Sequence, residues 1–215
     1  AITEKIRNSF FEMWIVSKDI RCQVSDVIKK NPHYNIAEQI KDVVLPVFKK
    51  ANLNWYTETI NKENIVFKKV IELVSQTQQS LLAENAFFIP PENLSDALAK
   101  LAANNVKISL ILNGPQLDLP MMGFYTSCLS YFEQIKLLDK NINVYNTPTN
   151  EFTHAKAFLV DNRILAIGSF NWDYRSAEWN SETLLTIENS EMINDFKEQF
   201  FKREQKANLI KTNQD

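Results

Sequence analysis

The stretch HAKAFLVDNRILAIGSFN, residues 154–171, decides the fold of this chain. Its apolar run 157–160 is followed by the turn-forming residues 161–163 and then by a second apolar run. Short apolar runs that are bounded by turn residues are typical of buried strands. We therefore expect two strands, near 154–160 and 163–168, with the polar residues of the stretch at the strand ends and in the adjoining loops.

The polar residues of this stretch suit the chemistry of a phosphate group. Residues two apart on a strand point to the same side of the sheet, so His154 and Lys156 are expected side by side. Lys156 supplies compact positive charge against the phosphate oxygens, and His154 can attack phosphorus or protonate a leaving alcohol. Ser169 and Asn171 can donate hydrogen bonds to phosphoryl oxygens, and Gly168 permits close backbone approach. No metal is expected, because Lys156 provides the charge that a cation would otherwise supply.

The spacing of these residues resembles the signature motif of the phospholipase D superfamily, which reads His-x-Lys, four residues, Asp, six residues, Gly-Ser-x-Asn. The segment from Arg175 to Glu182 is similar to the continuation of that motif. By this resemblance Asp161 and Glu182 join the candidate catalytic residues, with Glu182 as the acceptor that orients the ring of His154. Two plainer interpretations stay open, in which Asp161 is a turn and local-network residue and Glu182 is a solvated strand residue.

The resemblance extends over most of the chain and is strongest over residues 80–188. Residues 80–90 and 106–113 resemble two strands in the second half of cardiolipin synthases. Residues 6–17 resemble the helix that follows the first motif in members with two motifs. By this order of elements the chain looks like the C-terminal half of a bacterial cardiolipin synthase of the C type, or of a related phospholipase D.

The chain departs from the family in carrying one motif where members use two. Its other histidine, His33, lies in the loop-like run 31–34, with no lysine two residues further on. The resemblance therefore implies that this chain holds half of an active site. The second half is expected from another copy, from a separate chain or from a missing N-terminal portion.

The composition sets further bounds. The 215 residues, 45% of them hydrophobic, suffice for one large domain with a sizeable core. A net charge of −2 and the lack of a basic tract argue against a dedicated nucleic-acid-binding protein. Cys22 and Cys128 show neither metal spacing nor a disulfide framework. No apolar run reaches the roughly 18–20 residues of a membrane span and no signal peptide is evident, so a bacterial cytoplasmic membrane face and secretion both stay open.

Helical and strand patterns alternate along the chain, which predicts an α/β fold with a mixed sheet and helices on both faces. Strands are expected near 80–89, 106–113, 142–145, 154–160, 163–168 and 182–188. Helices are expected near 66–74, 94–104, 120–138 and 193–200. Asn93 is the expected N-cap of the helix that begins near residue 94.

Two parts are expected in the domain organisation. Residues 1–62 are predicted to be a mostly helical connecting segment. Residues 63–215 are predicted to form the phospholipase D-like catalytic half-domain, which holds the single motif.

Apolar side chains near the motif have two possible roles. The aromatic residues are Phe152, Phe158, Phe170, Trp172, Tyr174 and Trp179. They form either an apolar wall for acyl chains or part of the core. The run 121–125 is likewise either an exposed entry for lipid or a buried helix start.

The resemblance implies three alternative functions. The leading one is phospholipid hydrolysis or phosphatidyl transfer through a phosphohistidine, with water or an alcohol as acceptor, peripheral membrane contact and no cofactor. The second is an endonuclease of the same superfamily that is active as a symmetric dimer. The third is an inactive half-domain that serves as a binding or assembly module.

Overall fold

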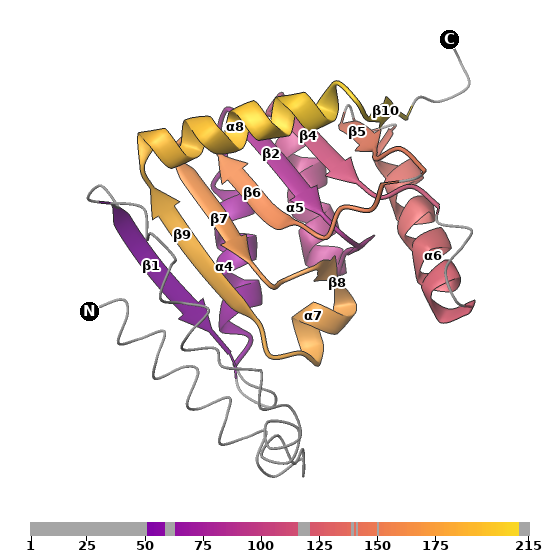
Figure 1. The fold of residues 1–215 in the computed structure, drawn as a ribbon. Coiled ribbons are helices and arrows are strands. Elements are labelled where there is room, and N and C mark those ends of the chain that lie inside the picture. The colour runs from indigo at the N-terminus through magenta and orange to yellow at the C-terminus, as the bar shows by residue number, and fades with distance from the viewer. Residues whose placement is uncertain are drawn as a thin grey trace, which may run out of the picture. The chain divides into compact units, whose positions relative to one another are not determined.

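The computed structural model describes residues 51–58, 63–115, 121–138, 140, 142–149 and 151–210. Their main feature is an eight-stranded mixed sheet (Figure 1). In spatial order its strands are β1 (Asn52–Thr57), β9 (Thr183–Glu188), β7 (Ile164–Gly168), β6 (Lys156–Val160), β2 (Ser80–Asn85), β4 (Lys107–Leu112), β5 (Asn143–Asn146) and β10 (Asn208–Leu209).

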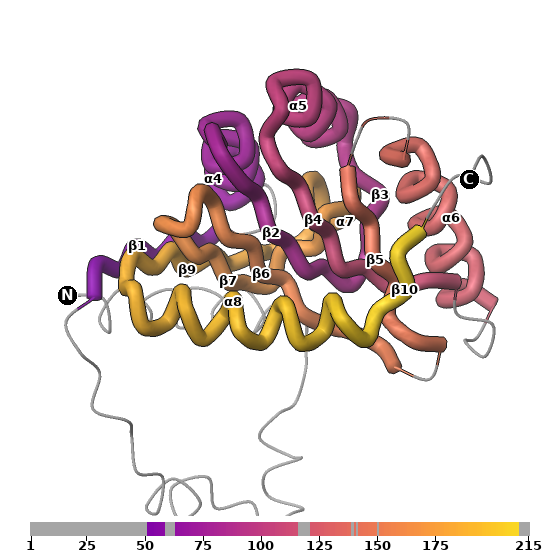
Figure 2. The backbone as a smooth tube through the Cα atoms, turned by 90° about the horizontal axis from the view of Figure 1, so that it is seen from above, coloured from indigo at the N-terminus to yellow at the C-terminus, as the bar shows by residue number. Residues whose placement is uncertain are grey.

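Helices cover both faces of this sheet, as predicted from the alternation in the sequence. The helices are α4 (Ile65–Ser75), α5 (Glu92–Ala103), α6 (Met121–Leu138), α7 (Tyr174–Glu178) and α8 (Ser190–Glu204). Figure 2 shows α4 and α5 on one face and α8 on the opposite face. None of the helices in the described ranges is both long and apolar enough to cross a bilayer.

The helix spacing in the sequence explains how α4 packs. Val66, Val70 and Val74 recur every four residues and are fully buried, and Phe67 and Leu73 beside them are also buried. This apolar face packs in the larger core cluster, with residues of α5 and of the sheet. A smaller cluster on the other face is centred on Ile193 and Phe200 of α8.

Strand polarity brings the ends of four strands to one edge of the sheet. Strand β6 is antiparallel to β2, so the last residue of β2, Asn85, pairs with the first residue of β6, Lys156. Strand β7 is antiparallel to β6 and to β9, so its last residue, Gly168, pairs with Leu184 near the start of β9. The polar residues before β6, after β7 and before β9 therefore gather at this edge.

The strand that was predicted near 80–89 is split in two. Strand β2 ends at Asn85, and β3 (Phe88–Ile89) pairs with β8 (Trp172–Asp173) in a separate two-stranded sheet. The Asn85 side chain links the two parts, since its Oδ1 accepts from the backbone N–H of Trp172 at 3.1 Å and its Nδ2 donates to the carbonyl of Phe170 at 3.3 Å. This buried amide ties the loop after β7 to the end of β2.

The predicted N-cap of α5 is wrong. The helix begins at Glu92, with Pro91 as its N-cap, so Asn93 lies within the first turn. Proline fixes its own φ and has no N–H to satisfy, which suits this position between an extended segment and a helix.

The predicted connecting segment, residues 1–62, lies largely outside the described residues. Its described part contains β1, which pairs with β9 in the register Asn52–Glu188 to Thr57–Thr183. The compact unit that holds the motif begins at Asn52.

Candidate active site

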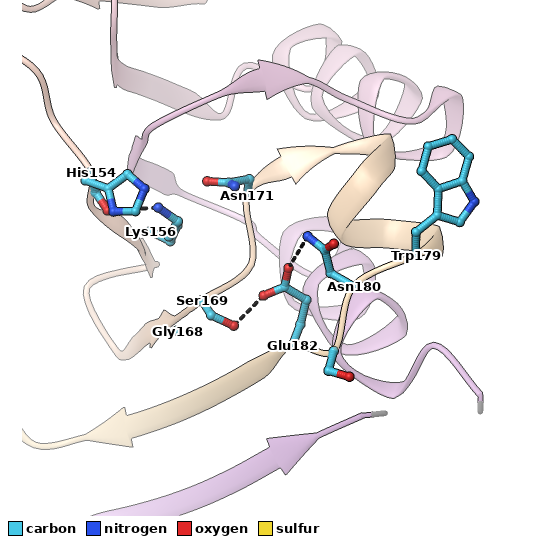
Figure 3. Close-up of a pocket in the computed structure, with 9 residues that line it drawn as sticks. His154, Lys156, Gly168, Ser169, Asn171, Trp179, Asn180 and Glu182 are labelled. Atoms are coloured by element: carbon cyan, nitrogen blue, oxygen red, sulfur yellow. Dashed lines mark hydrogen bonds between the residues drawn. The ribbon is translucent and has the colours of Figure 1, made fainter. Parts of the chain in front are cut away.

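His154 and Lys156 lie side by side at the sheet edge described above (Figure 3). Lys156 is the first residue of β6, while His154 lies in the loop before it and is exposed. The Lys156 ammonium donates a hydrogen bond to the His154 carbonyl oxygen at 3.0 Å. Partial burial lowers the pKa of Lys156 from its ordinary value, and the nearby carboxylates of Glu182 and Asp173 act in the opposite direction.

The Gly-Ser-x-Asn segment follows β7 and faces the same space. The Ser169 hydroxyl donates to the Glu182 carboxylate and accepts the backbone N–H of Thr183 at 3.0 Å. The backbone N–H of Asn171 donates to Ser176 Oγ at 3.2 Å, whereas its side-chain Oδ1 is buried without a hydrogen-bond partner among the described residues. Asn171 is nevertheless one of the residues that line the cavity described below.

The backbone of Gly168 does make a close approach, as predicted, and its neighbour is the backbone of strand β9. A Cβ at this position would lie against the carbonyl oxygen of Thr183 and 3.1 Å from Cα of Leu184. Both neighbours are backbone atoms of β9, which cannot move aside without disturbing the sheet. Gly168 therefore lets β7 and β9 run close together just before Ser169.

Glu182 is buried, with 3% of its surface exposed, so it is not a solvated strand residue. Its carboxylate accepts hydrogen bonds from Ser169 Oγ and from Asn180 Nδ2, the latter at 3.1 Å (Figure 3). Among the described residues, no hydrogen bond joins it to His154. The predicted pair of Glu182 with the His154 ring is thus not formed, and the carboxylate instead holds the serine of the motif.

Asp161 lies at the opposite edge of the sheet from His154. It follows the last residue of β6 and has a positive φ of 50°. Its carboxylate accepts the backbone N–H groups of Gln78, Gln79 and Ser80, at distances from 2.7 to 3.2 Å. These contacts match the interpretation of Asp161 as a turn and local-network residue, and they place it away from the other candidate catalytic residues.

A network that was not predicted holds the loop in front of β6. Asn113, just after β4, accepts the Thr153 backbone N–H and donates to the Thr153 carbonyl, both at 2.9 Å. The Thr153 hydroxyl donates to Oε1 of Glu84 at 2.6 Å, and Glu84 is 2% exposed. These contacts fix the residue immediately before His154. The sequence signal for them was a polar residue at the end of each of two apolar strands, Glu84 in one and Asn113 after the other.

These residues surround a cavity of about 660 Å³. It is lined by His154, Lys156, Gly168, Ser169, Asn171, Trp179, Asn180, Ser181 and Glu182. One general acid or base, one fixed cation and several hydrogen-bond donors thus share one space, which suits a phosphodiester. Within the described ranges, no three His, Cys, Asp or Glu side chains are grouped so that they could hold a metal ion.

The aromatic residues near the motif have divided roles. Phe158, Phe170 and Trp172 are buried in the core. Phe152, Tyr174 and Trp179 are exposed, and Trp179 forms part of the cavity wall. The core interpretation therefore holds for the three buried rings, while the apolar wall stays a prediction for the three exposed ones.

The fold and this cavity together define a phospholipase D-like domain with one His-x-Lys motif. The chain belongs to the family described as "Cardiolipin synthase, PLD-like domain", whose model matches residues 70–204. This confirms the superfamily and the cardiolipin synthase-like half that the motif predicted. The assignment to the C type stays a prediction.

The most similar relatives include two bacterial cardiolipin synthases. The chain is 30% identical over 131 residues to that of Clostridium perfringens and 34% identical over 132 residues to that of Oceanobacillus iheyensis. These matches cover 61% and 60% of this chain but 26% of each relative. The chain thus spans about a quarter of the length of the curated relatives it matches.

Solved structures show the same fold at lower identity. Nuc from Salmonella typhimurium, a phospholipase D family member, has a TM-score of 0.61 at 17% identity, covering 76% of this chain and 100% of Nuc. The phosphatidylserine synthase of Haemophilus influenzae has a TM-score of 0.65 at 17% identity, covering 78% of this chain and 42% of that protein. The fold therefore occurs both as a whole chain and as part of a longer one.

Proposed function

We propose that this chain supplies one half of an active site that hydrolyses or transfers the phosphodiester of a phospholipid. The observation that carries this proposal is the convergence of His154, Lys156, Ser169 and Asn171 on one open cavity. The names of the relatives support a lipid substrate, since those with the same motif-bearing domain are cardiolipin synthases.

The reaction needs two histidines. A histidine from a second motif attacks phosphorus and forms a P–N bond, while the P–O bond to the head group breaks and His154 gives its proton to the leaving alcohol. Water or a second alcohol then transfers a proton to His154 and attacks phosphorus, which breaks the P–N bond. Lys156 stabilises the charge on the phosphoryl oxygens in both steps. The roles of the two histidines can be exchanged without changing this balance.

The second motif is expected from a partner half. His154 is the histidine that lines the described cavity, and a single histidine cannot serve as both nucleophile and leaving-group acid in one step. A second copy of this chain, a separate chain or a further part of the same protein would each supply the missing group. The chain alone, as a monomer, should therefore have little or no turnover.

The test measures release and exchange of head groups on vesicles of phosphatidylglycerol and of phosphatidylethanolamine. Wild type is compared with His154→Ala at protein concentrations that span monomer and dimer. His33→Ala is the matched control, because it removes the other histidine of the chain. Single-stranded and duplex DNA are offered in parallel.

Each outcome of this test assigns a different function to the chain. Lipid turnover that is lost in His154→Ala and kept in His33→Ala supports the proposal, and the products separate a hydrolase from a transferase. DNA cleavage without lipid turnover would overturn it in favour of the dimeric endonuclease. No turnover at any concentration, even with an added second-motif half, would assign the chain as a binding or assembly module.

A further inference from the structure

Helix α6 turns mostly polar side chains toward the core and large apolar side chains outward, which is the reverse of an ordinary surface helix. Three of its four buried side chains are polar, those of Ser127, Ser130 and Gln134, and the fourth is Leu137; Gln134 is 0% exposed. Its outward side carries large apolar residues, with Met121 79%, Met122 75% and Phe132 61% exposed. A surface helix normally places its apolar stripe on the core, so this arrangement indicates an apolar partner outside the described residues.

Hydrogen bonds fix α6 in this rotation. Gln134 donates to the carbonyl of Asn113 at 2.9 Å and accepts from Asn146 Nδ2 at 2.7 Å. The hydroxyl of Ser130 accepts the backbone N–H of Phe88 at 3.1 Å. Rotating the helix to bury its apolar stripe would break all these bonds and leave their buried partners unsatisfied. The outward apolar face is therefore a stable property of the fold.

A groove connects this face with the active site. Its volume is about 490 Å³, and its lining includes Met122 and Gly123 of α6, Ile89 of β3 and Phe87 just before that strand. Three of its lining residues, Asn171, Trp179 and Asn180, also line the catalytic cavity. A molecule with a phosphate beside Lys156 and an apolar tail could thus occupy both spaces at once.

We propose that the outward face of α6 docks on a phospholipid bilayer and that the groove takes an acyl chain of the lipid bound in the catalytic cavity. This proposal rests on the proposed function for the identity of the lipid. Tyr125 and Tyr174 are 65% and 50% exposed, and Trp179 is 70% exposed. Such rings are favoured at the boundary between head groups and acyl chains, since one end is apolar and the other polar. The partner half of the proposed function must also reach this cavity, so it is the competing occupant that the test distinguishes from a bilayer.

The test measures partition of the full chain to phosphatidylglycerol–phosphatidylcholine vesicles by flotation. The variant Met121→Ser/Met122→Ser removes two exposed apolar side chains from α6. The control Ile65→Ser/Leu209→Ser removes two from other elements, where they are 43% and 42% exposed. Vesicles with brominated acyl chains are added to quench tryptophan fluorescence, and Trp179→Phe identifies the fluorophore.

Wild type should bind the vesicles, and the α6 variant should bind at least about tenfold more weakly, whereas the control should bind like wild type. Bromine quenching should be largely lost in Trp179→Phe. Equal weakening in both double variants, or no vesicle binding by wild type, would overturn the proposal. So would a change from dimer to monomer in the α6 variant with vesicle binding intact, because the face would then dock a protein.

His154→Ala separates this proposal from the proposed function. The variant should bind vesicles like wild type while turnover is lost. If it kept turnover, the proposed function would fail, and the docking proposal would still be decided by the flotation and quenching results.

Discussion

Arg203 of α8 lies 2.6 Å from Glu84 of β2, measured from Nη2 to Oε2, and the Glu84 side chain is 2% exposed. The other carboxylate oxygen of Glu84 accepts the hydroxyl of Thr153, which immediately precedes His154. Within the part of the chain that the structure describes, Oε2 has no aligned hydrogen bond, so the contact with Arg203 is primarily one of charge. A helix on one face of the sheet is thus coupled, through one buried carboxylate, to the loop that carries the candidate catalytic histidine.

This coupling makes Thr153 a positioning residue. Thr153→Val keeps the shape of the side chain but leaves Oε1 of Glu84 without its donor, so the free energy of unfolding should fall by about 1–3 kcal/mol. In the enzyme with both motifs, kcat should fall by about tenfold with little change in KM, because His154 is held less firmly. Urea unfolding and steady-state kinetics measure the two effects. Thr153→Ser should restore both, and equal kinetics for Val and Ser would show that the hydroxyl does not position the loop.

Gly168 should tolerate no larger side chain. In Gly168→Ala the added methyl group meets the backbone of Thr183 and Leu184, so β7 and β9 must separate, at a cost of about 1–3 kcal/mol in the free energy of unfolding. Gly114→Ala is the matched control, because its Cβ would meet the side chain of Asn146 at 3.2 Å. Urea titrations of the two variants should show the larger loss for Gly168. A comparable loss in both would contradict the close backbone contact.

Asp161 should matter for stability rather than for the chemistry. Asp161→Ala leaves the N–H groups of Gln78, Gln79 and Ser80 without their acceptor, which should lower the free energy of unfolding by about 2 kcal/mol. Binding of inorganic phosphate by the folded protein should not change. A loss of phosphate affinity in folded Asp161→Ala would instead place Asp161 in the catalytic machinery.

The contribution of Asp161 should also depend on pH. Partial burial acts to raise its pKa, but the three backbone N–H groups and the charge of Arg163 outweigh this and hold the pKa below its ordinary value. The folded state therefore binds this proton less readily than the unfolded state. The stabilisation is present above the unfolded pKa and is lost as pH falls through the folded pKa. Urea titrations near pH 7 and near pH 3 should show this dependence in wild type and a smaller one in Asp161→Asn.

The titration of Lys156 should weaken anion binding at alkaline pH. Burial lowers the pKa of Lys156, so on raising the pH the side chain loses its charge before an ordinary lysine, with a pKa of about 10.4, would do so. The affinity for inorganic phosphate should therefore fall as pH rises through the folded pKa. Between the two pKa values the unfolded state binds more protons, so stability rises with pH there, opposite to affinity. Lys156→Arg should bind phosphate with a flat alkaline profile, since arginine stays charged. If phosphate affinity fell in the same way at alkaline pH in Lys156→Arg, the decline would come from the titration of another group.

The core helices and the motif were predictable because each rests on local spacing. The four-residue spacing of Val66, Val70 and Val74 sufficed for α4, and the motif from His154 to Asn171 contains five of the residues that line the cavity. The edge strands β1 and β10 were not predicted. Neither carries a strong apolar run, since each is paired on one side only and lies partly or wholly exposed.

The partners of buried charges could not be predicted either. The sequence suggested Glu182 as the partner of His154, whereas the structure pairs Glu182 with Ser169 and Asn180. It gave no sign that Glu84 meets Arg203 from the far end of the chain. Which carboxylate faces which donor depends on how strands and helices are placed in three dimensions, and a single sequence does not encode this in any local pattern.

The link between Glu84 and Arg203 also sets an order of events during synthesis. The segments that carry His154, Ser169 and Glu182 leave the ribosome before α8 does, and until then Glu84 lacks the charge of Arg203. The nascent domain can form its sheet early except for β10, but the loop before His154 is fixed only when residue 203 has emerged and α8 has docked. Ribosome-bound chains that stop short of Arg203 should therefore be compact and still lack a rigid active site.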